Sequence, residues 1–172
     1  YNPTIAAGND GRLYLAWEDN RFGNPDIYFA TSTDGMLWTD AIRVTKSLAR
    51  QQNPVIAIDD DTYGRTYLAW QDDQNGDEDI HVAVSTNEFA TQNEQVVGGG
   101  VGDQTEPDMA IDSKGTVYVV WTSEAEDGSR DIHGSALRSG HWVEEIIVSG
   151  VQEQYQPAIS TEDQGDTLHL VW

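Results

Sequence analysis

The chain of 172 residues has 30 acidic residues against nine basic ones, and its net charge of −21 repels phosphate backbones, so nucleic acid is excluded as an expected partner. A content of 38% hydrophobic residues, with six tryptophans, indicates a folded core rather than a disordered chain. The lack of cysteine excludes disulfides and thiolate zinc sites, and no apolar run approaches the ~18 residues that a membrane span requires.

Recurring landmarks divide the chain into similar units. A proline opens each unit, a run ending in tryptophan follows ("RLYLAW", "RTYLAW", "TVYVVW", "TLHLVW"), and an Asp-Ile pair comes next in the first three. The tryptophans are Trp17, Trp70, Trp121 and Trp172, spaced by 53, 51 and 51 residues, and the prolines are Pro3, Pro54, Pro107 and Pro157. The expected repeats are approximately 1–50, 51–103 and 104–153, with an incomplete one at 154–172.

Each unit predicts four strands in chain order. The first follows the proline, the second ends at the tryptophan, the third begins at the Asp-Ile pair, and the fourth lies in "AIRVT", "EQVVG" or "EEIIVS". The runs are short and rich in β-branched and aromatic residues, and no stretch keeps a helical period. We therefore predict an all-β protein, a β-propeller of four-stranded antiparallel blades with about three and a half blades present. A β-sandwich is the alternative, but it does not require repeating landmarks.

A turn between the third and fourth strands of the first unit carries the sequence "STDGMLW". Ser32 and Asp34 can accept backbone N–H groups of a tight turn that contains Gly35, and Trp38 is expected to fold beneath it. The stretch resembles the Asp box of sialidase-like (BNR-repeat) propellers, Ser-x-Asp-x-Gly-x-Thr-Trp, with one residue fewer and leucine for threonine. The box is degraded in the second unit and nearly lost in the third. The resemblance implies a structural turn, away from any active site.

Ligands of propellers usually bind at one end of the central channel, and the loops that enter the first strand of each blade are expected to face that end. The candidate ligand-binding residues are Arg50, Gln51, Asp103, Gln104, Gln154 and Tyr155 in these loops, with Arg21 between the second and third strands. The recurrent glutamines could bind sugar hydroxyls or the backbone of the neighbouring blade, and recurrence favours the structural role. Sialidases hold a carboxylate with three arginines and use a Tyr–Glu pair. The chain lacks the Arg-Ile-Pro element, so we predict no catalytic residue.

The loop between the second and third strands of the second unit is strongly acidic. Its candidate calcium ligands are Asp72, Asp73, Asn75, Asp77 and Asp79, because Ca²⁺ prefers oxygen donors. The order departs from the EF-hand pattern, since Gly76 precedes Asp77, and a solvated acidic loop is the alternative reading. No other cofactor is expected.

The predicted function is recognition by a non-catalytic, secreted or cell-surface module that binds glycan or protein through its channel-end loops. One alternative is a fragment of a glycoside hydrolase whose catalytic residues lie in blades outside this sequence, and another is a structural repeat of a surface assembly. A chain that does not begin with methionine is expected to lack its natural N-terminus. Remaining blades or a second copy are expected to close the ring.

Overall fold

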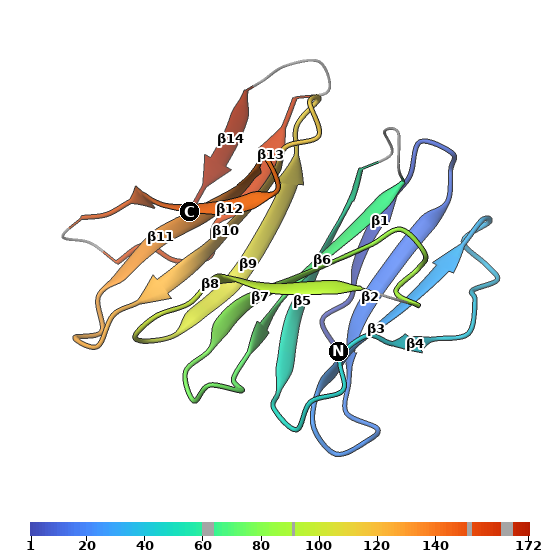
Figure 1. The fold of residues 1–172 in the computed structure, drawn as a ribbon, viewed down its shortest axis with the longest axis horizontal. Helices are drawn as coiled ribbons and strands as arrows, with labels where there is room; N and C mark the ends of the chain where they lie inside the picture. The colour runs from blue at the N-terminus through green and yellow to red at the C-terminus, as the bar shows by residue number, and fades with distance from the viewer. Residues whose placement is uncertain (60–63, 91, 151–152, 163–166) are drawn as a thin grey trace.

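The computed structural model describes residues 1–59, 64–90, 92–150, 153–162 and 167–172. Every regular element in this part of the chain is a β-strand. No helix of the described residues is long and apolar enough to cross a membrane. Three four-stranded sheets, here called blades 1 to 3, stand side by side in chain order, and a two-stranded sheet follows them (Figure 1).

The strands within each sheet are antiparallel and keep their chain order. Blade 1 contains β1 (Thr4–Ala7), β2 (Leu13–Asp19), β3 (Asp26–Ser32) and β4 (Ile42–Arg43). Blade 2 contains β5 (Gln51–Asp59), β6 (Arg65–Asp72), β7 (Asp79–Ser85) and β8 (Asn93–Gly98). Blade 3 contains β9 (Gln104–Ile111), β10 (Val117–Glu124), β11 (Arg130–Arg138) and β12 (His141–Val148). The last sheet contains β13 (Ala158–Thr161) and β14 (Leu168–Val171).

The first strands of the blades lie next to one another. Strand β5 contacts β1 on one side and β9 on the other, and β9 in turn contacts β13. This arrangement of three complete blades and the first two strands of a fourth confirms the all-β fold predicted from the repeats.

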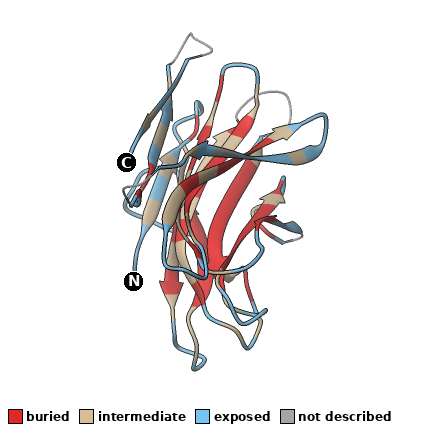
Figure 2. Cartoon of the chain, turned by 90° about the vertical axis from the view of Figure 1, so that its left-hand side faces the viewer, coloured by how far each residue is buried: buried red, intermediate tan, exposed pale blue. Residues whose placement is uncertain are grey.

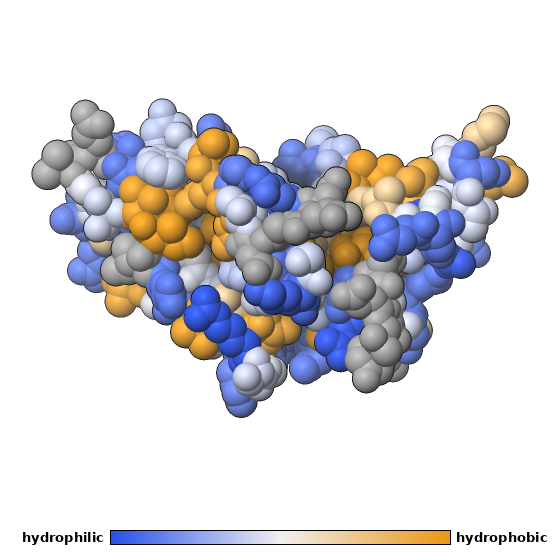
Figure 3. All heavy atoms as spheres, turned by 90° about the horizontal axis from the view of Figure 1, so that it is seen from above, coloured by the Kyte–Doolittle hydropathy of each residue, from blue (hydrophilic) through white to orange (hydrophobic). Residues whose placement is uncertain are grey.

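The core lies between the blades. One cluster joins blades 1 and 2 and includes Phe29, Leu68 and Trp70, and a second joins blades 2 and 3 and includes Tyr67 and Trp121. Both tryptophans are fully buried, and Figure 2 shows the buried residues concentrated along the middle of the stacked sheets. Seen from above, hydrophobic side chains reach the surface in separate patches among hydrophilic ones (Figure 3). Each repeat therefore stabilises its neighbours, as expected for a protein built by stacking equivalent units.

A backbone bond joins each blade to the next one. The N–H of Gln51 donates to the carbonyl of Pro25 at 2.9 Å, and the N–H of Gln104 donates to that of Glu78 at 2.6 Å. The N–H of Gln154 donates in the same way to Arg130, at 3.1 Å. Every acceptor directly precedes the Asp-Ile pair of its repeat, so the residues before the repeat proline of one unit bond to the Asp-Ile region of the unit before it.

The turn after β3 contains the hydrogen bonds expected of its box. Ser32 Oγ accepts the N–H of Gly35 at 2.9 Å, and Asp34 Oδ1 accepts the N–H groups of Met36 and Leu37 at 2.8 Å each. The two N–H donors, that of Leu37 first, lower the pKa of Asp34. Trp38 differs from the expectation, because 36% of the residue is exposed rather than packed beneath the turn. Short β4 leaves little sheet for the ring to cover.

The equivalent turn of blade 2 buries its aromatic ring. Ser85 Oγ accepts the N–H of Asn87 at 3.1 Å and that of Phe89 at 2.9 Å, so the serine again accepts backbone N–H groups of the turn. Phe89 is 5% exposed and meets Phe29 of blade 1 edge to face, with ring centroids 5.0 Å apart. The buried aromatic of the box is therefore found in the second repeat, where it fastens blade 2 to blade 1.

Candidate functional site

One polar residue per repeat stands where the first strand of that repeat begins. These residues directly precede the repeat prolines and all have positive φ values, and they are Asn2, Asn53, Glu106 and Gln156. The pairing of β9 with β10 shows the cause, because its register shifts between Val120 and Thr122 and leaves Glu106 and Pro107 outside the ladder. Proline has no N–H to donate to a ladder, which favours such a bulge at this position.

The residue that follows each repeat tryptophan holds the bulge of the next blade. Glu18 Oε1 accepts the N–H of Asn53 at 2.6 Å, and it also accepts the side-chain amide of Asn2 at 2.7 Å. Gln71 Oε1 accepts the N–H of Glu106 at 3.0 Å. These bonds replace ladder bonds that the bulge loses, and they fix the direction in which the bulged side chains leave the backbone.

The same arrangement continues from blade 3 to the last sheet. Thr122 Oγ1 accepts the N–H of Gln156 at 3.0 Å and donates to Glu106 Oε2 at 3.1 Å. The N–H of Gln156 also contacts Glu106 Oε2 at 3.1 Å. Glu106 is thereby oriented by groups from two neighbouring units.

Two hollows meet at Glu106. The larger, of about 520 Å³, is lined by Asn53, Glu106, Pro107, Asp108, Gln156, Pro157 and Ala158. The smaller, of about 210 Å³, is lined by Asp103, Thr105, Glu106, Thr122, Glu124, Arg130 and Tyr155. Glu106 is the residue common to both, and we call the two hollows together the channel mouth.

Asp108 is the second carboxylate of the channel mouth. Burial raises its pKa, although Oδ2 accepts the N–H of Ile159 at 2.7 Å and a bond from the N–H of Met109 acts in the same lowering direction. A carboxyl that retains its proton to higher pH than usual thus lines the same hollow as Glu106, two residues away in the chain. Neighbouring carboxyls in unlike surroundings are the arrangement from which proton-transfer sites are built.

The structure brings two of the predicted ligand residues to the channel mouth. Asp103 and Tyr155 line its smaller hollow, and Tyr155 is 52% exposed. Arg50 lies elsewhere, with Nε donating to Asp73 Oδ2 at 2.8 Å. Arg21 also lies apart, paired with Asp19 and placed over the Tyr28 ring at 4.8 Å from its centroid.

The three recurrent glutamines line neither hollow of the channel mouth. Gln51, Gln104 and Gln154 are all buried, and their backbones make the blade-to-blade bonds described above. Gln104 Oε1 accepts the indole N–H of Trp121 at 2.8 Å, and Gln51 Nε2 donates to Ser47 Oγ at 2.7 Å. Of the two roles considered for them, these contacts favour the structural one.

The residues of the acidic loop are engaged in separate contacts. Asp73 pairs with Arg50, Asp79 Oδ2 accepts the amide of Asn75 at 2.8 Å, and Asp77 Oδ2 accepts the N–H of Gly102 at 3.4 Å. Asp72 Oδ1 accepts the N–H of Gln74 at 2.9 Å. The calcium site at Asp72, Asp73, Asn75, Asp77 and Asp79 remains a prediction.

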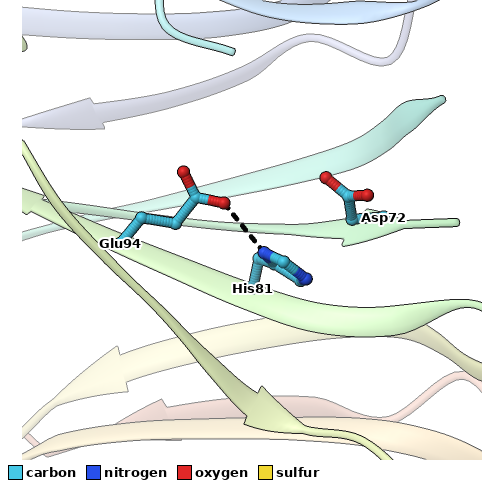
Figure 4. A group of neighbouring side chains, drawn as sticks. All are labelled: Asp72, His81 and Glu94. Atoms are coloured by element: carbon cyan, nitrogen blue, oxygen red, sulfur yellow. Dashed lines mark hydrogen bonds and ion pairs between the residues drawn. The ribbon is translucent and has the colours of Figure 1, made fainter. Parts of the chain in front are cut away.

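A different group in blade 2 has ligand chemistry suited to a divalent cation. Asp72, His81 and Glu94 come from β6, β7 and β8, and one ligand atom of each lies within 4.8 Å of the others (Figure 4). His81 Nδ1 lies 2.9 Å from Glu94 Oε1. Blade 3 repeats this pair as His133 and Glu144, 3.2 Å apart. Because the pair recurs as a cross-strand contact, its geometry is explained without an ion.

Comparison with known proteins identifies the fold. The sequence matches no family model and no curated protein. The structure is similar to an endo-arabinase from Bacteroides thetaiotaomicron, with a TM-score of 0.66 and 16% identity over 98% of this chain and 72% of that one. It is similar to a thermostable family-43 glycoside hydrolase, with a TM-score of 0.66 and 16% identity over 98% and 63% of the two chains. It also matches an α-L-arabinanase from Penicillium chrysogenum complexed with arabinobiose, with a TM-score of 0.67 and 18% identity over 96% and 56%.

The fold is that of a partial β-propeller. The resemblance to propellers of the glycosidase type holds at the level of fold, and these neighbours are glycoside hydrolases other than sialidases. The chain spans 72% of the first neighbour and 56–63% of the other two. An identity of 16–18% with these three structures is a likeness of fold alone.

The channel-mouth residues that the sequence interpretation missed carry a visible signal. Asn53, Glu106, Asp108 and Gln156 lie within one residue of a repeat proline, and the position before that proline is polar in every unit. The residue before the repeat proline leaves the strand ladder of blades 2 and 3 because proline has no N–H, so its polar character is the signal that indicates the channel mouth.

Proposed function

We propose that the protein recognises glycans at the channel mouth, with Glu106 at the centre of the site. The observation that carries this proposal is the convergence of Asn53, Glu106, Asp108 and Gln156, from three successive units, on one open hollow of about 520 Å³. That volume falls within the ~300–1,000 Å³ of small-molecule sites.

The lining chemistry suits a saccharide. Sugar hydroxyls both donate and accept hydrogen bonds, carboxylates such as that of Glu106 accept them, and the amides of Asn53 and Gln156 do both. Tyr155 offers an exposed ring in the adjoining hollow, against which the apolar face of a sugar can pack. The solved structures with this fold are glycoside hydrolases, which supports a carbohydrate ligand.

Glycoside hydrolysis is a second candidate function, and the raised pKa of Asp108 favours it. Hydrolysis of a glycosidic bond uses one protonated and one ionised carboxyl group. Asp108 would hold the proton, and Glu106, oriented by Thr122 and the Gln156 backbone, is the second carboxyl group of the same hollow. A sialidase-like glycoside hydrolase whose catalytic residues belong to other blades is the alternative from the sequence.

Calorimetry with the purified chain tests the proposal. Arabino-oligosaccharides and sialyl-oligosaccharides serve as probes, because the neighbours act on the first class and the box resembles a family that acts on the second. We expect binding that Glu106→Gln weakens at least about tenfold, since it removes charge-assisted hydrogen bonds. The exposed Glu126→Gln in the β10–β11 turn is the matched control and should bind as the unaltered chain does.

The outcomes separate the two candidate functions. Binding without release of reducing sugar supports recognition alone, whereas release that disappears in Asp108→Asn supports hydrolysis. Equal binding by the unaltered chain, Glu106→Gln and Glu126→Gln would contradict a site at the channel mouth.

We also propose a secreted or cell-surface location and ring closure by further blades or a second copy. The last sheet supports the second point, since Leu168, Val171 and Trp172 are 38%, 65% and 58% exposed. Light scattering on the 172-residue chain tests it, and a monodisperse monomer would contradict self-association.

A further inference from the structure

We propose a second ligand site, a pocket for a neutral saccharide between blades 2 and 3. The pocket encloses about 460 Å³ and contains none of the channel-mouth residues. Its residues come from the start of β6, the end of β7, the start of β8 and the β11–β12 hairpin. In antiparallel blades these positions lie at the opposite end from the first residues of β5 and β9, where the channel mouth lies.

The corresponding space between blades 1 and 2 is filled by Phe89. The connection from β7 to β8 covers residues 86–92, and it is long enough to return this ring against Phe29 of blade 1. Glu88, beside the ring, pairs with Arg12 in the β1–β2 turn of blade 1. The β7–β8 loop of blade 2 thus fills the gap between blade 2 and blade 1.

The β11–β12 connection of blade 3 is too short to fill the gap between blade 3 and blade 2 in this way. Strands β11 and β12 are joined by Ser139 and Gly140 alone, with φ values of 52° and 81°, as in a tight two-residue hairpin turn. On the facing side, in blade 2, Val82 has the position in β7 that Phe29 has in β3, so β7 offers a valine where β3 offers a phenylalanine ring. The pocket lies at the position that corresponds to the Phe29–Phe89 contact one blade earlier, and Trp142 of the short hairpin lines it.

The floor of the pocket is apolar and its rim is rich in amides. The floor contains Tyr67, Val82, Val84, Leu137 and Trp142, and the polar residues are Arg65, Ser85, Thr86, Gln92, Asn93 and Gln95. Asn93 and Gln95 are exposed, at the start of β8. A pyranose ring has an apolar face that packs on aromatic side chains and a rim of hydroxyls that bond to amides, so it matches both parts.

The charge of the surroundings selects a neutral sugar over an acidic one. The chain has a net charge of −21, which repels anionic ligands. Arg65 is the lining residue with a positive charge, and it already takes part in an interaction with another group. A uronate or sialate would therefore find no free cation in the pocket lining to receive its carboxylate.

Nuclear magnetic resonance of the ¹⁵N-labelled chain tests the pocket with maltose, cellobiose, xylobiose and arabinobiose as probes. Saccharide contact should shift the indole N–H signal of Trp142, which Trp142→Phe identifies. We expect Gln95→Ala to weaken binding about 3- to 10-fold, the effect of one lost hydrogen bond. The control Asn9→Ala removes an exposed amide from the β1–β2 turn and should leave the titration unchanged.

A second variant fills the pocket instead of trimming its rim. Val82→Phe introduces the ring found at Phe29 and should abolish binding, and an otherwise unaltered ¹⁵N spectrum shows that the fold is kept. Glu106→Gln should leave the Trp142 titration unaltered, so failure of the channel-mouth proposal would not affect this one. The proposal is overturned if none of the four sugars shifts the Trp142 signal, or if Gln95→Ala and Val82→Phe titrate like the unaltered chain. Tighter binding of digalacturonate than of the neutral sugars would also overturn it.

Discussion

Replacing Phe89 by alanine tests which aromatic ring of the two box turns fastens the blades. Phe89 is 5% exposed and packs edge to face on Phe29, so Phe89→Ala should cost about 3–5 kcal/mol, the usual range for a buried phenylalanine. About 1 kcal/mol of that comes from the aromatic pair. For a chain of this length, the loss corresponds to a fall in melting temperature of about 10 °C. Trp38 is 36% exposed, so Trp38→Ala should cost only about 1 kcal/mol despite the larger ring.

Urea unfolding followed by circular dichroism measures both losses. Phe89→Leu is the control, because it keeps most of the apolar area and should recover more than half of the stability lost in Phe89→Ala. A Trp38→Ala variant as destabilised as Phe89→Ala would refute the reasoning. Such a result would mean that the Trp38 ring is buried in solution.

Three other outcomes follow from the charged groups. Burial raises the pKa of Asp108 above 3.8, so this carboxyl contributes stability below pH 3.8 and that stability is lost as the pH rises through the raised pKa. In Asp108→Asn, the free energy of unfolding should no longer fall over this pH range. The hydrogen bond from Arg21 lowers the pKa of Asp19 to about 2, so Arg21→Ala should return it toward 3.8 in a carboxyl titration by nuclear magnetic resonance. Binding of Ca²⁺ at the acidic loop should raise the melting temperature in a saturable way, and an unchanged melt in millimolar Ca²⁺ would contradict the calcium site.

The fold could be predicted because its landmarks do the same physical task in blades 2 and 3. Trp70 and Trp121 are fully buried between blades, and Pro54 and Pro107 lie at bulges, so the spacing of these residues shows the period. The exposure of Trp38 could not be predicted in this way. Whether a box ring is buried depends on the neighbouring blade, as the contact of Phe89 with Phe29 shows, and single-repeat patterns contain no information on that neighbour.

The candidate site was predicted only in part, for a related reason. Asp103 and Tyr155 were found because they lie in the entering loops, which do face the channel end. The recurrent glutamines lie in the same loops, but they point between blades, and Gln104 bonds to Trp121. Sequence position places a loop at one end of the blade, whereas the bulge at the proline decides which side chain turns into the hollow.

The blade-to-blade bonds also bear on how such a chain can change its length. Every donor, as at Gln51, has its acceptor in the preceding repeat, as at Pro25, and the same relation holds at each boundary. Duplication or loss of one whole repeat would therefore recreate every bond at the new junction. An insertion of half a repeat would leave a donor facing the wrong strand. Growth in steps of one complete repeat is the route that this pattern of contacts permits.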